Sequence, residues 1–473
     1  MARPTPKVRL AAMLGEIVPR LLIRLGCARL AAQLCARSVI ERLADGSKVK
    51  AEAVDGSKLV VLALTALKFR GDLDALAAKP DIRLLEMPHG WQIRLLFSFY
   101  PRGTKSNLIF RPETNAVVGR CQEKYRTFLR VFLRELYNRL NVACVIGADV
   151  RYREDIDIGV VSKEVGVPYL VFHRECMLAS KELYDAVRRR HSSWGRFPGS
   201  AVIVHNEVSR RNFVESGFVE PERVEVLGSA RMDEFLRLIQ TAGRDPAPNG
   251  LVVLFSFFHP MFKYPQSVFA KAHVAAARVA QRNPGVEVIV KPKVEIVNKS
   301  TWQQFYDEAL RAVDIDPATL PNLKVMPAAN AQSLILHASV VCAINSTTLL
   351  EAGAAGVPVV VPCFTEIQGS DYTNRVNFRD ELGIFDVPAD ADEMVAMIER
   401  RIKNTVVDGA LIECRRALFE KYVTPTSGGA TDRYRAVILK HVASAGAPFV
   451  MRSALHMLQA HGLGDPVATA GSQ

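Results

Sequence analysis

Several features that would identify a broad class of protein are missing from this sequence. No run of 18 or more apolar residues is present, so we expect no membrane-spanning helix. No short-period repeat or low-complexity segment is visible either. The chain of 473 residues, 49% hydrophobic and 23% charged, has the composition of a soluble globular protein with two or three domains.

Cysteine patterns typical of metal sites or disulfide frameworks are also missing. No CxxC pair occurs among the eight cysteines, which are scattered along the chain. Several of them lie within apolar, strand-like runs such as "ACVIGAD" and "VVCAIN". This pattern is typical of reduced thiols in a core, so it favours the cytoplasm and argues against cysteine-bound metal.

Acidic residues are fewer than basic ones, and the net charge of +12 predicts an anionic partner. Nucleic acid is disfavoured because no basic patch interleaved with aromatic residues is visible. The remaining candidates for the anionic partner are a membrane surface and a phosphate-bearing small molecule.

The first 40 residues contain many arginines and one acid, Glu16. Because arginines interrupt every apolar run, a signal peptide is not expected. The apolar residues recur at helical spacing, which leaves two interpretations. One is a basic amphipathic helix lying on anionic lipid, and the other is a helix packed on the N-terminal domain with its arginines in water.

Two series of apolar, β-branched runs alternate with helix-like segments and predict an α/β fold with two Rossmann-like domains. The first series occupies 58–67, 82–88, 142–149, 168–173, 200–206 and 223–229. The second occupies 251–258, 286–292, 322–327, 339–345 and 358–364. Two prolines and two glycines within 241–250 indicate a linker. The predicted parts are a basic helical extension (1–50), an N-terminal domain (51–240), the linker (241–250), a C-terminal domain (251–445), and a C-terminal helix and tail (446–473).

Ligands of open α/β sheets bind at the carboxyl ends of strands, so polar residues at those ends are the candidates for a site. The strongest group follows the strand at 339–345. Ser346 or Thr347 is placed to cap the next helix. The free backbone amides at the start of that helix, together with the hydroxyls of Ser346, Thr347 and Thr348, are suited to bind a phosphate. Glu351, one turn into the helix, is placed to accept hydrogen bonds from ribose. The alternative is a capping box of Thr348 and Glu351 that only stabilises the helix.

The stretch "INSTTLLEAGAAGVPVVVP" resembles the donor-site segment of GT-B glycosyltransferases and their relatives in bacterial surface-carbohydrate synthesis. These relatives include capsule Kdo transferases, CDP-glycerol glycerophosphotransferases and UDP-GlcNAc 2-epimerases. "VEVLGSARMDEF", "FRDELGIF" and "SGGATDRYRAVI" resemble further segments of the same proteins, so the resemblance covers most of 140–440. It implies a GT-B architecture whose two domains face a cleft, with a nucleotide-linked donor held by the C-terminal domain. Ser229 and Arg231 would touch that donor or close the N-terminal domain.

The sequence departs from these relatives at the second strand of the C-terminal domain. Many relatives end that strand with a His-Pro pair, where this chain has Lys291 and, beside it, Lys293. The two lysines either hold the donor phosphate or form a solvated rim. The first strand of the domain does end in a His-Pro pair, so His259 is a candidate contact for phosphate or the reacting sugar, or else a structural histidine.

Glycosyl transfer with inversion needs a carboxylate or imidazole that takes the proton of the acceptor hydroxyl. The candidates at strand ends of the N-terminal domain are Glu175 or His173, then Asp149, then His89. Arg151 and Arg153 would contact a phosphate or an acidic acceptor. Alternatively, each of these could be a polar loop residue whose hydrogen bonds are satisfied and which has no catalytic role.

The resulting prediction is a cytoplasmic glycosyltransferase, peripheral at the inner membrane if its N-terminus binds lipid. It would move a sugar or sugar-like group to a surface polysaccharide or glycolipid, such as capsule or lipopolysaccharide. No metal and no cofactor besides the nucleotide-sugar substrate are predicted, because the "DID" at 155–157 lies in a helix-like start and not after a strand. The alternatives are a nucleotide-sugar 2-epimerase of the same fold and a non-catalytic protein of polysaccharide assembly.

Overall fold

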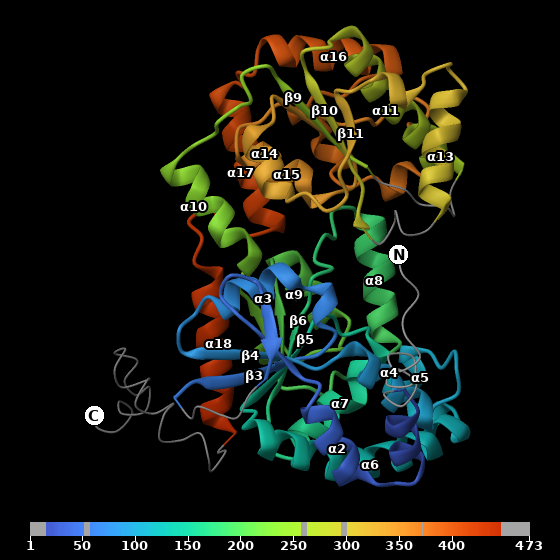
Figure 1. Cartoon of the computed structure of the whole chain (residues 1–473), viewed down its shortest axis with the longest axis vertical. Helices are drawn as coiled ribbons and strands as arrows, with labels where there is room; N and C mark the ends of the chain where they lie inside the picture. The colour runs from blue at the N-terminus through green and yellow to red at the C-terminus, as the bar shows by residue number, and fades with distance from the viewer. Residues whose placement is uncertain (1–15, 52–56, 257–262, 295–299, 371, 446–473) are drawn as a thin grey trace, which may run out of the picture. The chain divides into compact units, whose positions relative to one another are not determined.

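The computed structural model describes residues 16–51, 57–256, 263–294, 300–370 and 372–445 (Figure 1). The chain forms two compact α/β units, each with its own sheet. Unit 1 comprises residues 1–175, 188–233 and 429–473, and unit 2 comprises 176–187 and 234–428.

Unit 1 contains an eight-stranded sheet with the order β2-β1-β4-β3-β5-β6-β7-β8. Its strands are β1 (Ile40–Arg42), β2 (Lys48–Lys50), β3 (Leu59–Ala63), β4 (Ile82–Glu86), β5 (Cys144–Gly147), β6 (Tyr169–Phe172), β7 (Ala201–Val204) and β8 (Val224–Val226). From β4 to β8 neighbouring strands are parallel. The central strands are buried along their whole length because helices cover both faces of the sheet, as expected for parallel strands made of apolar runs.

The helices of unit 1 lie between these strands and at both ends of the chain. Residues 16–24 are helical. The others are α2 (Ala28–Ala36), α3 (Arg70–Ala77), α4 (His89–Phe99), α5 (Ser106–Phe110), α6 (Ala116–Leu140), α7 (Arg153–Glu164), α9 (Glu207–Glu215) and α18 (Ala430–Ser444). The boundary between the units falls within α8 (Lys181–Ser192) and at the start of α10 (Asp233–Thr241).

Unit 2 has a five-stranded, fully parallel sheet with the order β11-β10-β9-β12-β13. The strands are β9 (Leu251–Phe255), β10 (Glu287–Lys291), β11 (Leu323–Val325), β12 (Val340–Ala343) and β13 (Val359–Val360). The helices around it are α11 (Lys263–Arg282), α13 (Ser300–Arg311), α14 (Ala331–His337), α15 (Thr347–Ala354), α16 (Ala391–Lys403) and α17 (Gly409–Tyr422). Written in chain order, this sheet is 3-2-1-4-5, the start of the Rossmann strand order.

All eleven predicted strands correspond to strands of the structure, and the two-domain α/β class is confirmed. The hairpin β1–β2 was missed, because residues 1–50 were predicted to be helical. Its strands have only three residues each, and β2 is exposed along its length, so no hydrophobic run marks them. A signal was nevertheless present in Asp45-Gly46, since Gly46 has φ +77° and Leu43 N donates to Ser47 O across the turn.

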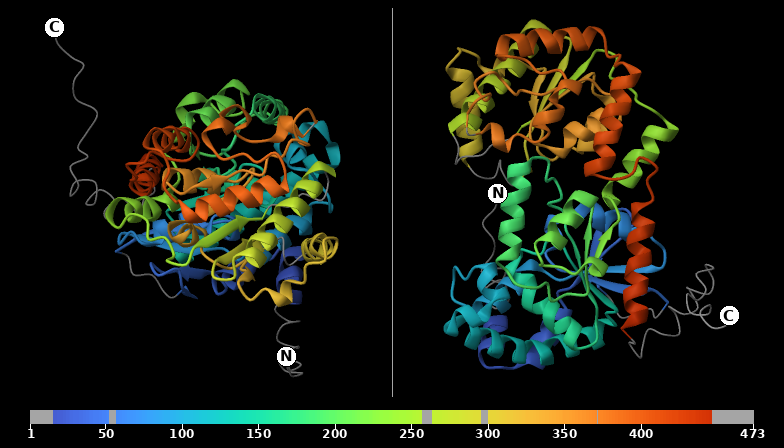
Figure 2. Two further views of the ribbon diagram at one scale, coloured as in Figure 1. Left: turned by 90° about the horizontal axis from the view of Figure 1, so that it is seen from above. Right: turned by 180° about the vertical axis from the view of Figure 1, so that it is seen from behind.

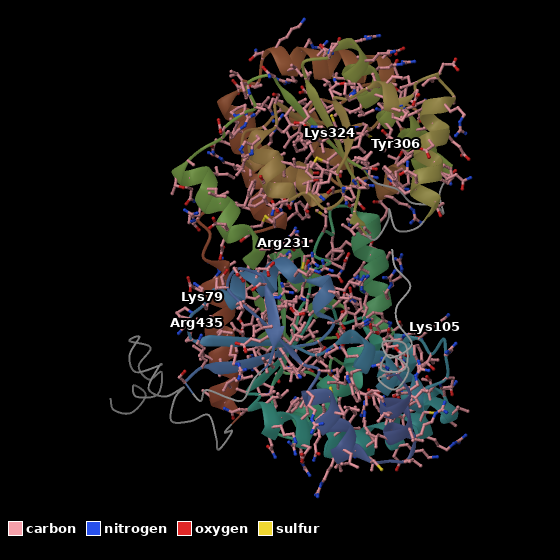
Figure 3. The ribbon with its side chains drawn as sticks, viewed as in Figure 1. Lys79, Lys105, Arg231, Tyr306, Lys324 and Arg435 are labelled. Carbon is pink, nitrogen blue, oxygen red and sulfur yellow. The ribbon has the colours of Figure 1, made fainter. Side chains whose placement is uncertain are left out.

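The last helix, α18, belongs to unit 1, although the sequence placed residues 251–445 in the C-terminal domain. Tyr434, Ile438 and Val442 lie in the same apolar core as β3, β5 and β6, and both sides of the structure show α18 along the first sheet (Figure 1, Figure 2). Two ion pairs fasten it to the loop 78–81 between α3 and β4: Lys79 to Asp432 at 2.6 Å, and Arg435 to Asp81 at 2.7 Å (Figure 3). The pattern of an amphipathic helix shows which of its faces is apolar but not which sheet that face covers. The sequence therefore did not indicate that α18 packs on the sheet of unit 1.

Candidate functional site

The sheet of unit 2 has its topological switch point between β9 and β12. The chain leaves β9 toward β10 on one side and leaves β12 toward β13 on the other. Ligands of open α/β sheets bind beside such a point, at the carboxyl ends of the two strands. The residues at the end of β12 are 345–348, which are partly exposed between a buried strand and a buried helix.

The turn after β12 is built around Asn345, whose φ is +53°. Asparagine tolerates this left-handed conformation better than most residues do. Its side chain accepts a hydrogen bond from Asn377 N at 2.8 Å and donates to Tyr372 Oη at 2.9 Å. Ser346 then caps α15 by accepting from Thr348 N at 3.3 Å, and the hydroxyls of Ser346 and Thr348 lie 2.8 Å apart. The start of α15 is therefore a fixed, hydroxyl-lined turn.

Glu351 is fully buried, and Gln332 Nε2 donates to its carboxylate at 2.8 Å. The predicted capping box of Thr348 and Glu351 is wrong, because the N-cap is Ser346 and the carboxylate pairs with a side chain of α14. The contact of Glu351 with ribose stays a prediction. It requires a ligand that either shares the Glu351 carboxylate with the Gln332 amide or displaces that amide.

The predicted lysines lie at the end of β10. Lys291 is the last residue of that strand and donates to Pro327 O at 3.1 Å, whereas Lys293 is exposed. His259 lies outside the described residues. Of the two lysines, Lys293 fits the alternative of a solvated rim, because its side chain is exposed.

A hydrogen-bonded network that the sequence analysis missed lies at the end of β9. Ser256, the residue after the strand, has its hydroxyl 2.9 Å from His273 Nε2 and 3.0 Å from Trp302 Nε1. His273 Nδ1 lies 2.6 Å from Phe269 O. Because the indole can only donate, Ser256 accepts from Trp302 and donates to a neutral His273, whose Nδ1–H donates to Phe269. Burial lowers the pKa of His273 to about 4, which agrees with the neutral ring.

In unit 1 the switch point lies between β3 and β5, since the chain leaves β3 toward β4 and β5 toward β6. Thr65, just after β3, has φ +48°, which is rare for a β-branched residue. Thr65 N donates to the side-chain oxygen of Gln92 at 3.1 Å, and the Thr65 hydroxyl donates to Asp155 at 2.8 Å. Burial raises the pKa of Asp155 well above its ordinary value. Backbone strain of this kind persists only where surrounding contacts impose it, and it is concentrated at functional sites.

Asp149, predicted as a base, is buried at the end of β5 and forms a cluster with Arg151 and His173. Arg151 holds its carboxylate through Nε at 3.0 Å and Nη2 at 2.6 Å, and His173 Nδ1 lies 3.5 Å away. Burial pushes the pKa of Asp149 upward, but the interactions with His173 and Arg151 outweigh this and hold it below its ordinary value. The carboxylate is therefore ionised at neutral pH.

Glu175 belongs to the same cluster but is exposed. Its carboxylate lies 3.7 Å from Arg151 Nη2, and 63% of its side chain is accessible to solvent. The structure thus brings Asp149, His173 and Glu175 together around Arg151.

Ser229 and Arg231 lie at the end of β8 in unit 1, not among the residues of unit 2 predicted to hold the donor. Arg231 N donates to Asp72 at 3.1 Å, and Arg174 Nε lies 3.7 Å from the same carboxylate (Figure 3). The hydroxyl of Ser229 is buried without a hydrogen-bond partner in the described part of the chain. Their position favours closure of the N-terminal domain.

Three further histidines of unit 1 are accounted for by local contacts. Burial lowers the pKa of His191 and of His205 to about 3, so both rings are neutral. His191 stacks on Phe213 at 4.6 Å between ring centres. Asn206, the residue after His205, caps α9 by accepting a hydrogen bond from Ser209 N at 2.8 Å. His89 pairs with Glu154 at 3.2 Å.

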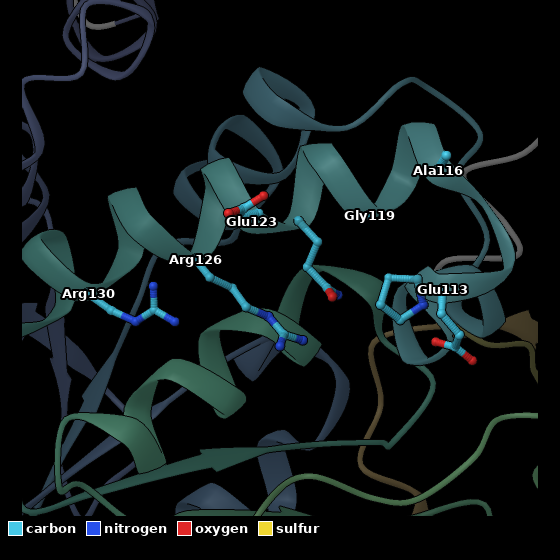
Figure 4. Close-up of a pocket in the computed structure, with 8 residues that line it drawn as sticks. Glu113, Ala116, Gly119, Glu123, Arg126 and Arg130 are labelled. Atoms are coloured by element: carbon cyan, nitrogen blue, oxygen red, sulfur yellow. The ribbon is translucent and has the colours of Figure 1, made fainter.

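A cavity of about 440 Å³ lies along α6 and the turn that precedes it (Figure 4). It is lined by Pro112, Glu113, Ala116, Gly119, Gln122, Glu123, Arg126 and Arg130. Its two arginines already pair with acids, Arg126 with Asp157 at 2.7 Å and Arg130 with Glu164 at 2.9 Å. None of the predicted site residues lines it, so the strand-end residues remain the candidate site.

Within the described ranges, no cluster of three or more His, Cys, Asp or Glu side chains is arranged as a metal site. Nor does any helix there combine the length and apolar character needed to cross a bilayer.

No protein-family model and no curated protein sequence matches this chain. Among solved structures it is similar to a UDP-GlcNAc 2-epimerase from Neisseria meningitidis, with 13% identity, a TM-score of 0.46, and coverage of 81% of this chain and 100% of that one. A putative UDP-N-acetylglucosamine 2-epimerase from Listeria monocytogenes has 13% identity, a TM-score of 0.47 and coverages of 82% and 97%. The calicheamicin glycosyltransferase CalG4 has 16% identity, a TM-score of 0.39 and coverages of 82% and 99%. At these identities and TM-scores the similarity assigns no function.

Proposed function

We propose that this protein is a glycosyltransferase of the GT-B type, moving a sugar or sugar-like group from a nucleotide-linked donor to a surface polysaccharide or glycolipid. The observation that carries the proposal is the turn 345–348, a hydroxyl-lined helix N-terminus at the switch point of a sheet with Rossmann strand order. Helix N-termini at this position bind phosphate through free backbone amides. The motif resemblance of the same turn to donor sites supports the same role.

In this proposal the donor phosphates lie at the start of α15, where they bind the hydroxyls of residues 346–348 and share the Thr348 amide with the Ser346 hydroxyl. The acceptor oxygen attacks the anomeric carbon of the donor, and the bond from that carbon to the phosphate oxygen breaks. The nucleotide leaves with the bonding electrons, and the acceptor proton passes to a general base.

His173 is the base that the cluster supports best. An ionised Asp149 with a lowered pKa is a weak proton acceptor, but it is well suited to orient an imidazole and stabilise its protonated form. Arg151 fixes the carboxylate from the other side. Glu175 is the second candidate, since its carboxylate is the accessible one of the cluster.

The test is a panel of CMP-, CDP-, UDP- and GDP-linked donors, read as thermal stabilisation and as nucleotide release with and without saccharide acceptors. We expect one nucleotide class to raise the melting temperature. If no nucleotide or nucleotide sugar does so, the proposal fails.

Variants locate the donor site. Glu351→Gln preserves the shape and the contact with Gln332 but removes the charge, so we expect weaker donor binding at unchanged stability. Thr347→Val removes one hydroxyl of the turn, and Thr319→Val, at an exposed site of unit 2, is its control. If Glu351→Gln lowers stability and leaves binding intact, the residue has a structural role only.

A nucleotide-sugar 2-epimerase is the second candidate, favoured by the compact set of Asp149, His173 and Arg151. The two activities are separated by omitting the acceptor. An epimerase changes the configuration at the sugar C2 while the sugar ends on its nucleotide, which NMR of the sugar protons detects. A transferase needs the acceptor for turnover, and a non-catalytic assembly protein shows neither reaction.

A further inference from the structure

The N-terminal helix of unit 1 has an exposed apolar face. In the described ranges, five leucine and isoleucine side chains are exposed, and four of them lie within 15 residues: Ile17 (50%), Leu21 (52%), Leu25 (66%) and Leu30 (54%). Scattered single apolar residues on a surface need no explanation, but such a cluster marks a docking surface.

The helix at 16–24 is divided into three faces. At about 100° of rotation per residue, Ile17, Val18 and Leu21, with Leu25 in the turn that follows, would span one arc of about 100°. Pro19 and Ile23 are buried on the opposite side, which fastens the helix to the unit. The exposed apolar arc is therefore not the face that packs against the protein.

Cations flank this arc on the remaining side. Arg20 and Arg24 follow it around the helix, both exposed, and Arg29 is exposed on α2. The one acid of this region, Glu16, is neutralised by Arg20 at 3.1 Å and by Arg94 at 3.0 Å. The surface is thus apolar with an excess of positive charge, since the arginines at 20, 24, 29 and 94 outnumber Glu16.

We propose that this face, Ile17, Val18, Leu21 and Leu25 with Arg20 and Arg24, docks unit 1 onto the surface of an anionic lipid bilayer. An apolar strip flanked by arginines matches the interface of such a bilayer, where apolar side chains enter the acyl boundary and guanidinium groups meet phosphate headgroups. A protein partner would match the apolar arc, but the arginines favour the phosphate-bearing surface. The proposal is independent of the proposed function.

The test is sedimentation of the full-length protein with vesicles of phosphatidylcholine alone and with vesicles of an equal mixture of phosphatidylcholine and phosphatidylglycerol. We expect binding to the anionic vesicles that weakens as salt is added. Arg20→Glu/Arg24→Glu is expected to weaken it by about 25-fold or more, since each cation near the surface contributes about fivefold. Leu21→Ser/Leu25→Ser is expected to abolish it.

The controls are Leu67→Ser, at an exposed leucine between β3 and α3, and Arg211→Glu, at an exposed arginine of α9. Both should bind vesicles as the unchanged protein does, and circular dichroism should show all variants folded. Leu25→Trp reports insertion directly, as a blue shift of its emission with anionic vesicles. Equal binding by the unchanged protein and Leu21→Ser/Leu25→Ser overturns the proposal, as does a failure to bind anionic vesicles. A change of oligomeric state in that variant without vesicle binding would instead assign the face to a contact between copies of the chain.

Discussion

The Ser256 hydroxyl connects two buried rings at the carboxyl end of β9, so its removal leaves two polar groups without partners. We expect Ser256→Ala to lower the free energy of unfolding by about 2–4 kcal/mol, because Trp302 Nε1 and His273 Nε2 each lose a hydrogen bond that water does not replace. Urea denaturation measures this loss. Thr319→Ala, whose exposed hydroxyl bonds only to a nearby backbone carbonyl, is the control and should change stability little. A similar loss of unfolding free energy in both variants would show that the Ser256 network contributes no more to stability than an exposed hydroxyl does.

The Asp149 carboxylate allows a second prediction for single residues, this time on activity. Asp149→Asn keeps the size of the side chain but loses the charge opposite Arg151 and His173. If Asp149 orients the base, kcat should fall by about 100- to 10,000-fold with little change in KM for the donor. Glu154→Gln removes the charge of the other carboxylate–histidine pair of unit 1, that of His89, and should leave kcat nearly unchanged. The reverse order of effects would move the catalytic base to His89.

Among the elements, the contact between α15 and α17 positions the candidate donor turn. Gly353 faces Arg415, whose side chain is buried and donates to Ile384 O at 2.8 Å. A Cβ at Gly353 would lie 3.2 Å from Arg415 Cβ, so this glycine permits the close packing of α15 against α17.

We expect Gly353→Val to lower the free energy of unfolding by about 1–3 kcal/mol, because the added methyl groups overpack the α15–α17 contact. Gly285→Val is the matched control, since a Cβ there meets no atom within 4 Å. Urea midpoints of the two variants give the comparison. If Gly285→Val loses as much stability, the loss reflects the removal of glycine and not the packing of the two helices.

Elements with a strong periodic signal were predictable from the sequence, and elements defined by distant contacts were not. The parallel strands appear as apolar runs because both their faces are buried, as in β3 and β12. The hairpin β1–β2 escaped because its short strands are polar, and α18 because its partner sheet lies more than 200 residues away along the chain. At the candidate site the residue types of 345–348 were visible, whereas the partners of Glu351 and Ser256 come from separate helices, which spacing along one element cannot reveal.

For the whole molecule, buried neutral histidines occur in both units, and these histidines all respond to acid in the same direction. His191 and His205 of unit 1 have pKa values lowered by burial to about 3, and burial lowers the pKa of His273 of unit 2 to about 4. An unfolded chain has histidine pKa values near 6.5. Between these values the unfolded state binds more protons than the folded state, so stability falls as the pH falls below about 6.5. Each histidine then accounts for up to about 2 kcal/mol lost at pH 5.

Buried carboxyl groups act in the opposite direction. Burial raises the pKa of Asp155 and of Asp157, so the folded state holds their protons more tightly and gains stability as the pH falls. The net pH dependence of the protein is the sum of both trends, and a single-histidine variant is needed to separate them.

His191→Phe makes that separation, because phenylalanine can stack on Phe213 as the imidazole does and cannot be protonated. The difference in unfolding free energy between this variant and the unchanged protein should shift in favour of the variant by up to about 2 kcal/mol from pH 7 to pH 5. Urea denaturation at the two pH values measures it, and His337→Gln, at an exposed position of unit 2, is the control for the loss of one histidine. A difference that stays constant between pH 7 and pH 5 would show that His191 takes up its proton over the same pH range in the folded protein as in the unfolded chain, contrary to the effect of its burial.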